Sequence, residues 1–480
     1  MLKSKFIVPI HIVDSIAQDS IYISEMIMKE QKIPKAQHIT IQFGVHTHAV
    51  KVLPNQKNQG IFIHPRLAQQ LGIPPLSSKS LQFDIQYMSK LSTIKLGPLL
   101  SVLINKETPE DMNKPFGVIS SFCRELAETC HAVGATVYFF TPSSIPLNGT
   151  FINGWILDGE WKKRPMPLAE IIYNRLPTRQ IENQAHVQRL FTQTAKKHNI
   201  FIFNERFLDK HDVFHALQDD ESVKHYLPES LLLEDFSTLK YMINKYYVVY
   251  VKPVQGSLGR GIYRIISLEN PKILTLEKAS STNQKPMKFS SISSLYRTFK
   301  SKLSRKQYQI QQGLSVIQVG RSPVDFRALV QKNSTGAWSI TSIVARTAGN
   351  ERFVANLARG GSIDTVTNTL PRTNLPQHFN AEDMLLALKR AAIAISEAID
   401  SNIDAHFGEL GVDLAIDVQG KVWLIEVNSK PSKNDNTPLR ENKIRPSVRK
   451  VVSYAKYLTG FKEGRNPHGS HRVRSRRRKN

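Results

Sequence analysis

The sequence has only two cysteines in 480 residues, Cys123 and Cys130, and this scarcity excludes a scaffold held together by several disulfides. The two lie seven positions apart in a stretch with helical periodicity. That spacing corresponds to about 10 Å along a helix axis, which is too far for a disulfide. We therefore expect two free thiols in a protein of a reducing cytosol.

Long hydrophobic runs are also missing. No stretch approaches the roughly 18 consecutive apolar residues that a membrane-spanning helix requires. The first 13 residues lack a sustained apolar segment and a small-residue cleavage site, so no signal peptide is predicted. At about 100–200 residues per domain, the length predicts two to four domains. We expect a cytoplasmic globular protein with no membrane span.

Acidic residues are few beside the basic ones, because 65 Lys and Arg stand against 40 Asp and Glu and give a net charge of +25. Residues 461–480 are strongly basic, without apolar periodicity, and are predicted as a disordered tail. Such a tail attracts a polyanion such as nucleic acid or acidic lipid without reading sequence. A solubilising end with no dedicated partner is the alternative.

Strand and helix signals divide the rest of the chain into three folded units. Residues 1–105 are predicted as a β-rich domain, because short runs rich in Ile, Val and Phe alternate with prolines. Residues 115–205 alternate helix and strand, which favours a small open α/β layer. Residues 206–460 form a third domain that includes antiparallel strand pairs. The predicted fold class is α/β or α+β.

Individual elements are expected at defined positions within these units. The expected strands of the first unit are 39–43, 46–53, 60–64 and 81–87, and its expected helices are 16–29 and 65–71. The second unit is expected to contain helices at 119–133 and 185–198 and strands at 135–140, 170–174 and 200–203. Apolar residues recur at helical spacing over 381–399 and predict the most regular helix of the third unit.

The first motif with chemical meaning begins at a buried-type strand, residues 248–251, which delivers Lys252 to its end. The loop that follows carries the glycines and donors Gly256, Ser257, Gly259, Arg260 and Gly261. Glycines let backbone N–H groups approach phosphate oxygens closely. Residues 262–266 resemble a second strand, so we expect a hairpin whose loop covers phosphates. An ordinary glycine-rich hairpin is an equal alternative for this loop alone.

The second motif is an apolar hairpin over residues 409–428 that contains two carboxylates. Gln419 and Gly420 suit a two-residue loop, and pairing of Val418 with Lys421 would set Asp413 opposite Glu426. Asn428 would lie on the same face as Glu426. Two opposed carboxylates repel unless a proton or cation lies between them, and these oxygen ligands suit Mg²⁺. The alternative is a solvated face that carries both acids.

The third region contains arginines in apolar surroundings. Arg327 lies in the middle of a predicted strand, where an unpaired cation would be costly. Arg346 and Asn356 follow in the same domain. A structural pair of Asp325 with Arg327 explains one arginine alone, whereas the combined set favours an anion site.

Together, the lysine-bearing strand, the glycine-rich loop and the late Asp-x12-Glu-x-Asn hairpin resemble the ATP-grasp fold. The arginine region resembles its glutathione synthetase and ribosomal-protein glutamate ligase branch, and the whole arrangement is similar to the endospore coat-associated YheC/YheD-like family. The resemblance implies an ADP-forming, ATP- and Mg²⁺-dependent carboxylate-amine ligase that acts through an acyl-phosphate. A role near the developing spore, in modification of its coat or envelope, is part of that implication.

The resemblance also implies roles for individual residues. Lys210 and Lys252 would bind the nucleotide, residues 256–261 would cover its phosphates, and Gln311, Gln312 and Leu314 would line the adenine pocket. One or two Mg²⁺ would be held by Asp413, Glu426 and Asn428. Arg327, Arg346 and Asn356 would face the acyl-phosphate and the substrates, which include a peptide or an amino acid among the options.

Two departures and two alternatives accompany this interpretation. Gln stands at the adenine position that often carries an acidic residue, and Gly411 stands where some ligases place an arginine, so Arg346 is the expected substitute. A nucleotide-binding assembly protein of the spore coat without turnover is the first alternative. A nucleic-acid-binding protein driven by the basic tail is the second.

Overall fold

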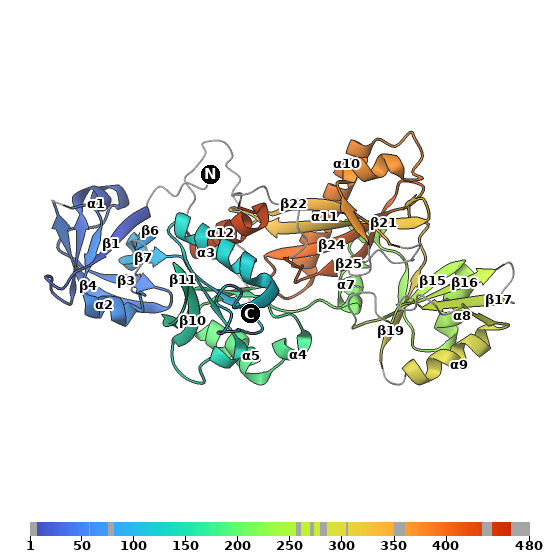
Figure 1. Cartoon of the computed structure of the whole chain (residues 1–480), viewed down its shortest axis with the longest axis horizontal. Helices are drawn as coiled ribbons and strands as arrows, with labels where there is room; N and C mark the ends of the chain where they lie inside the picture. Colours follow the sequence, from blue (N-terminus) through green and yellow to red (C-terminus); the bar gives the residue numbers. More distant parts are fainter. Residues whose placement is uncertain are drawn as a thin grey trace.

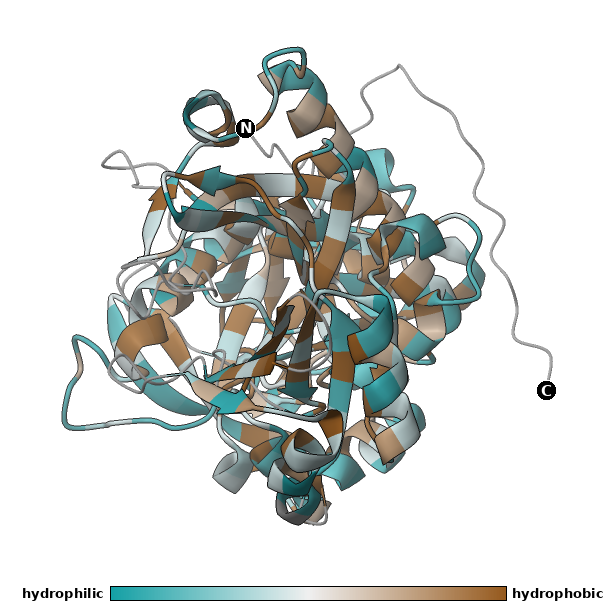
Figure 2. Ribbon diagram, turned by 90° about the vertical axis from the view of Figure 1, so that its right-hand side faces the viewer, coloured by the Kyte–Doolittle hydropathy of each residue, from teal (hydrophilic) through white to brown (hydrophobic). Residues whose placement is uncertain are grey.

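The computed structural model describes residues 7–56, 58–74, 81–255, 261–268, 273–278, 286–303, 306–349, 361–433 and 444–461. In these residues the chain forms four sheets that follow one another along the long axis (Figure 1). Hydrophobic residues line the inner strands, while hydrophilic residues cover much of the outer helices and loops (Figure 2). No helix among the described residues combines the length and hydropathy needed to cross a lipid bilayer.

The first sheet closes into a barrel in the order β1-β5-β2-β4-β3-β7-β6. Its elements are β1 (Ile7–Ile12), β2 (Ser20–Ser24), α1 (Glu25–Gln31), β3 (His38–Phe43), β4 (His46–Asn55), β5 (Ile61–Ile63), α2 (Pro65–Leu71), β6 (Gln82–Met88) and β7 (Thr93–Gly97). The helix predicted at residues 16–29 is wrong over residues 16–24, because α1 begins only at Glu25. Residues 20–24 instead form β2, because the barrel pairs them with both β4 and β5.

The second, central sheet has the order β11-β10-β9-β8-β12-β13. Its elements are β8 (Leu99–Leu103), α3 (Ser120–Ala132), β9 (Thr136–Phe140), β10 (Phe151–Asp158), β11 (Glu160–Pro167), β12 (Ile171–Asn174), α4 (Arg179–Glu182), α5 (Ala185–Arg189), α6 (Ala195–His198) and β13 (Phe201–Phe203). The predicted boundary at residue 105 therefore differs from the structure. Strand β8 lies between β9 and β12 in this sheet, and it does not belong to the barrel.

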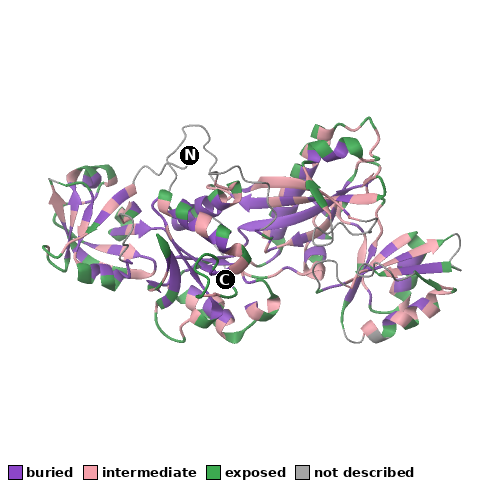
Figure 3. Ribbon diagram, viewed as in Figure 1, coloured by how far each residue is buried: buried purple, intermediate pink, exposed green. Residues whose placement is uncertain are grey.

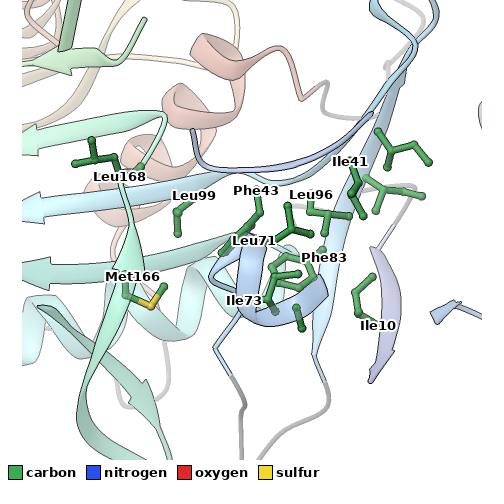
Figure 4. Close-up of a cluster of buried hydrophobic side chains, with 14 of the residues drawn as sticks. Ile10, Ile41, Phe43, Leu71, Ile73, Phe83, Leu96, Leu99, Met166 and Leu168 are labelled. Atoms are coloured by element: carbon green, nitrogen blue, oxygen red, sulfur yellow. The ribbon is translucent and has the colours of Figure 1, made fainter. Parts of the chain in front are cut away.

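The barrel and the central sheet share one hydrophobic core. Phe43, Phe83 and Leu96 of the barrel pack in the same cluster as Leu99 and other residues of the central sheet, including Met166 and Leu168 (Figure 4). Both cysteines are buried free thiols in the neighbouring cluster around α3. The two units therefore form one packed body.

The third sheet, which we call the small lobe, has the order β14-β19-β15-β16-β17-β18. Its elements are β14 (Ser230–Leu232), α8 (Phe236–Lys245), β15 (Val248–Pro253), β16 (Tyr263–Leu268), β17 (Ile273–Lys278), β18 (Met287–Phe289), α9 (Ile292–Leu303) and β19 (Tyr308–Gln312). Strands β15 and β16 pair antiparallel, which confirms the predicted hairpin. Helices α8 and α9 cover one face of the sheet, and this core contains only residues 233–310.

The fourth sheet, which we call the large lobe, has the order β23-β22-β21-β24-β25, with β20 beside β21. Its elements are α7 (Lys210–Leu217), β20 (Gln318–Val319), β21 (Ser322–Lys332), β22 (Trp338–Thr347), β23 (Ser362–Asp364), α10 (Val366–Thr369), α11 (Ala381–Asn402), β24 (Glu409–Ile416) and β25 (Val422–Asn428). Helix α11 confirms the predicted helix and buries its apolar side against the sheet. The opposite face is left for polar side chains.

Helix α12 (Pro446–Thr459) joins three of these units. Its apolar residues pack with α3 and the central sheet, and the helix also contacts β21. Lys456 reaches the barrel, where its Nζ lies 2.7 Å from Oδ2 of Asp84 in an almost fully buried pair. Burial is correspondingly dense along the central sheet and the large lobe (Figure 3).

Candidate functional site

The β24–β25 hairpin sets two carboxylates opposite each other. Asp413 pairs in register with Glu426, and Asn428 lies opposite Gly411. Residues two apart on a strand point to the same face, so the three polar side chains share one face of the large-lobe sheet. Asp413 is buried, and the Glu426 side chain is 30% exposed.

The turn of this hairpin differs from the predicted two-residue loop. The N–H of Asp417 donates to the carbonyl of Lys421, so the turn is longer, and Gly420 adopts a φ of +79° within it. A bulge then leaves Ile425 without a partner between Leu424 and Glu426. The two one-residue shifts cancel, and the predicted pair of Asp413 with Glu426 is restored.

Two arginines hold Asp413. Arg327 donates to both carboxylate oxygens of Asp413, from Nε and, at 2.8 Å, from Nη2. Nη2 of Arg346 lies 3.2 Å from Oδ1 of the same residue. Burial disfavours the ionised form of Asp413, but the charges of Arg327 and Arg346 outweigh it and hold its pKa below the usual value.

Gly411 makes room for this arrangement. A Cβ atom at residue 411 would lie 3.3 Å from Nη1 of Arg327 and 3.1 Å from Cβ of Pro431. Both distances are tight for carbon, so a side chain here would push Arg327 aside. Arg327 therefore lies against Gly411. Some ligases carry an arginine at the position of Gly411, and Arg327 and Arg346 are the two candidates to replace it here.

The small lobe contributes Lys252 from β15. Its Nζ donates to Oε1 of Gln311 on the neighbouring strand β19, and Nε2 of Gln311 donates to Oγ of Ser230 at 2.8 Å. Burial, followed by the nearby charge of Lys210, lowers the pKa of Lys252 to about 8, against the attraction of Glu426. Lys252 is therefore a half-buried cation that loses its proton more readily than an ordinary lysine.

Alternation along β19 separates the two glutamines of the predicted adenine pocket. Gln311 shares the face of Lys252, whereas Gln312 lies on the face that carries α8 and α9, and its Oε1 accepts a hydrogen bond from the N–H of Glu229 at 3.2 Å. Leu314 follows in the connection between β19 and β20 and is half-buried. Only Gln311 of the pair turns its side chain toward Lys252.

Lys210 lies beside the carboxylate hairpin of the large lobe. It is the first residue of α7, a helix whose N-terminus is capped by Asp209 through the N–H of Asp212 at 2.8 Å. Its Nζ lies 3.3 Å from Oε1 of Glu426. The charges of Lys210 and Glu426 both act on Lys252. The predicted nucleotide lysines and one predicted metal ligand are therefore neighbours.

The donor set fits a hard divalent cation. Asp413, Glu426 and Asn428 offer carboxylate and amide oxygens on one face, the ligands that Mg²⁺ prefers. Within the parts of the chain that the structure describes, no group of three or more His, Cys, Asp or Glu side chains is arranged to hold a metal ion. Such a two-carboxylate set suits a cation that also takes ligands from bound phosphates.

Sequence reasoning missed the part played by Asp325. Its Oδ1 accepts a hydrogen bond from Nε of Arg346 at 2.5 Å, across the β21–β22 pair. The suggested pairing of Asp325 with Arg327 is not the ion pair found there, since Arg327 pairs with Asp413. The signal in the sequence was the alternation of apolar and charged residues over 324–327, because it places Asp325 and Arg327 on the same face of the strand.

Several predicted site residues lie outside the described parts of the chain. They are Gly256, Ser257, Gly259, Arg260 and Asn356, together with the basic tail from residue 462. Gly261 is described, with a φ of +75°, at the start of the return toward β16.

Comparison with known proteins assigns this chain to a family. A model of the YheC/D-like ATP-grasp family matches residues 199–458. The Bacillus subtilis endospore coat-associated proteins YheD and YheC are 27% and 24% identical over 370 and 323 residues, which cover 76% and 65% of this chain and 80% and 85% of theirs. D-alanyl-alanine synthetase A of Vibrio cholerae is 11% identical with a TM-score of 0.43, over 76% of this chain and 98% of that one. Because the family match spans more than half of the sequence, the chain belongs to the YheC/D-like ATP-grasp family.

Proposed function

We propose that this protein is an ATP- and Mg²⁺-dependent ligase that joins a carboxylate to an amine through an acyl-phosphate. One observation carries the proposal: Lys210 lies beside Glu426, which faces Asp413 across the hairpin, and the charges of Lys210 and Glu426 act on Lys252 of the other lobe. Lysines, arginines and paired carboxylates together can neutralise a nucleotide and its cation.

Each group has a role in this proposal. Lys210 and Lys252 bind phosphate oxygens, Gln311 and Leu314 line the adenine pocket with the backbone of Gln312, and Arg327 and Arg346 stabilise negative charge on the transferred phosphoryl group. Asp413, Glu426 and Asn428 would hold one or two Mg²⁺, which supply charge neutralisation at the phosphates. The roles implied for residues 256–261 and Asn356 remain part of the proposal.

The reaction has two steps. A carboxylate oxygen of the substrate attacks the γ-phosphorus of ATP, the bond from this phosphorus to the β,γ-bridging oxygen breaks, and ADP and an acyl-phosphate are formed. The amine nitrogen then attacks the acyl carbon, phosphate leaves, and the amine proton passes to solvent. Phosphoryl transfer depends on position and charge, so no covalent protein nucleophile is needed.

The names of the curated relatives suggest where such a ligase would act. YheD and YheC are endospore coat-associated proteins. We propose a cytoplasmic enzyme near the developing spore that modifies a coat or envelope component. Peptides, wall components and free amino acids are the substrate classes to compare.

Two measurements test the proposal. Mg²⁺ with ADP or a non-hydrolysed ATP analogue is expected to raise the melting temperature of the full chain, because a ligand that binds the folded state stabilises it. ADP release is then screened over pairs of amino acids, peptides and wall fragments. No thermal shift would refute nucleotide binding. A shift without ADP release over the whole screen would instead favour the assembly protein without turnover.

The affinity for Mg-ADP is expected to fall as the pH rises through 8. Lys252 of the free protein loses its proton near this pH, whereas bound phosphates favour the charged form. Above this pH, Lys252 must take up a proton when Mg-ADP binds, so the affinity for Mg-ADP falls by up to about tenfold per pH unit. Calorimetric titrations from pH 7 to 9.5 measure this slope.

The Lys252→Arg variant is the control for this slope, because arginine keeps its charge over the whole range. Its affinity should stay flat between pH 8 and 9.5, whatever its absolute value. A wild-type affinity that is equally flat would contradict the role of Lys252.

A further inference from the structure

Asp325 is a partly buried carboxylate that the proposed reaction does not use. It opens the polar face of β21, in register with Arg346 of β22. Nε of Arg346 donates to its Oδ1 at 2.5 Å, and the two side chains are 18% and 12% exposed. An ion pair so little exposed to water fixes the orientation of both groups.

Arg346 is shared between two carboxylates. Asp325 takes its Nε, while its Nη2 lies 3.2 Å from Oδ1 of Asp413. Arg327 occupies both oxygens of Asp413 from the other side. The four side chains form a neutral row in the order Asp325, Arg346, Asp413 and Arg327. Each guanidinium that Asp413 holds must be displaced, or must turn, before that carboxylate can take a cation.

We propose that Asp325 is a positioning residue that holds the Nε side of Arg346 and so limits the competition between Arg346 and the divalent cation for Asp413. This inference rests on the proposed function, since Asp413 is a cation ligand only there. Without the Asp325 charge, Asp413 is the remaining carboxylate in contact with Arg346. The arginine then turns its donors onto Asp413 and competes with the cation for the same oxygens.

The test measures how much Mg²⁺ is needed to stabilise the protein in the presence of ADP. Melting temperatures of the full chain are recorded at a fixed saturating ADP concentration while MgCl₂ is increased. Asp325→Asn is expected to raise the half-saturating Mg²⁺ concentration roughly tenfold, as loss of a group that orients a metal ligand does elsewhere. A merely structural role would lower the melting temperature without ligand but leave this concentration unchanged.

The matched control is Asp364→Asn. Asp364 ends the neighbouring strand β23 and pairs at 2.7 Å with Arg372, and the two side chains are 36% and 56% exposed. This variant should keep the wild-type half-saturating concentration. Where Asp325→Asn fails to fold, Asp325→Ser removes the same charge in a smaller side chain and carries the same expectation.

A double-variant comparison shows whether Asp325 acts through Arg346. In an Arg346→Gln background, Asp325→Asn should change the half-saturating Mg²⁺ concentration by less than about twofold, because the competing arginine is gone. An equal rise in both backgrounds would overturn the inference, and so would a wild-type value for Asp325→Asn alone. Absence of any Mg²⁺-dependent stabilisation of the wild-type protein would instead refute the proposed function.

Discussion

Glu426→Gln is expected to reduce Mg²⁺-dependent ADP release by at least about 100-fold while the protein stays folded. The change keeps the size of the side chain but removes one of the two opposed charges of the β24–β25 hairpin. Without that charge, the proposed cation site keeps only one of these two carboxylate charges and attracts a divalent cation more weakly. The measurement is steady-state ADP release with a substrate pair found in the screen.

Glu397→Gln makes the same chemical change on an exposed position of α11 and should retain wild-type activity. Helix α11 covers the face of the large-lobe sheet opposite to the carboxylates, so this control tests whether the effect is local. Near-normal ADP release by a folded Glu426→Gln protein would remove Glu426 from the proposed cation site.

The second large effect is expected on stability, at Glu409. This fully buried carboxylate lies where the large lobe meets the central sheet, and it accepts contacts from Arg175 at 3.1 Å, from Lys433 at 2.5 Å and from Tyr173. Burial opposes its ionisation, but the Lys433 and Arg175 charges outweigh it and hold its pKa below the usual value. Glu409→Gln would leave two buried cations without their counter-charge, at a cost of about 3–5 kcal/mol in the free energy of unfolding.

Urea denaturation followed by circular dichroism measures this loss. Glu221→Gln is the control, because Glu221 forms an exposed pair with Lys224 and its removal should cost less than about 1 kcal/mol. Addition of Lys433→Met to Glu409→Gln should recover part of the stability, since it removes one of the two unmatched charges. Equal effects of the Glu409 and Glu221 variants would show that the buried network contributes little.

The sequence was sufficient for the features that depend on local pattern. Helix α2 and helix α11 begin at Pro65 and Ala381, where the sequence predicts them. The β15–β16 hairpin follows from two apolar runs around a glycine-rich loop. The facing pair of Asp413 and Glu426 is also predicted correctly, but only because the longer turn and the bulge shift the register in opposite directions.

What the sequence reasoning missed depends partly on a local side chain in the hairpin turn and partly on non-local contacts. Asp417 accepts hydrogen bonds from the N–H groups of Gln419 and Lys421 and lengthens the turn, and the compensating bulge at Ile425 has no local signature. Residues 20–24 become a strand only because the barrel supplies two neighbours for them. The choice of Asp413 as partner of Arg327 likewise depends on which strand lies beside β21.

Helix α12 carries a consequence for biosynthesis. Phe122, Cys123 and Leu126 of α3 are buried together with Val448, Val451 and Val452, which are added to the growing polypeptide more than 300 residues later. During translation the apolar side of α3 therefore stays uncovered until α12 has been made. The small lobe, which has its own core, can already collapse before then. Nascent chains of this protein should consequently expose an apolar surface to ribosome-associated chaperones during most of their synthesis.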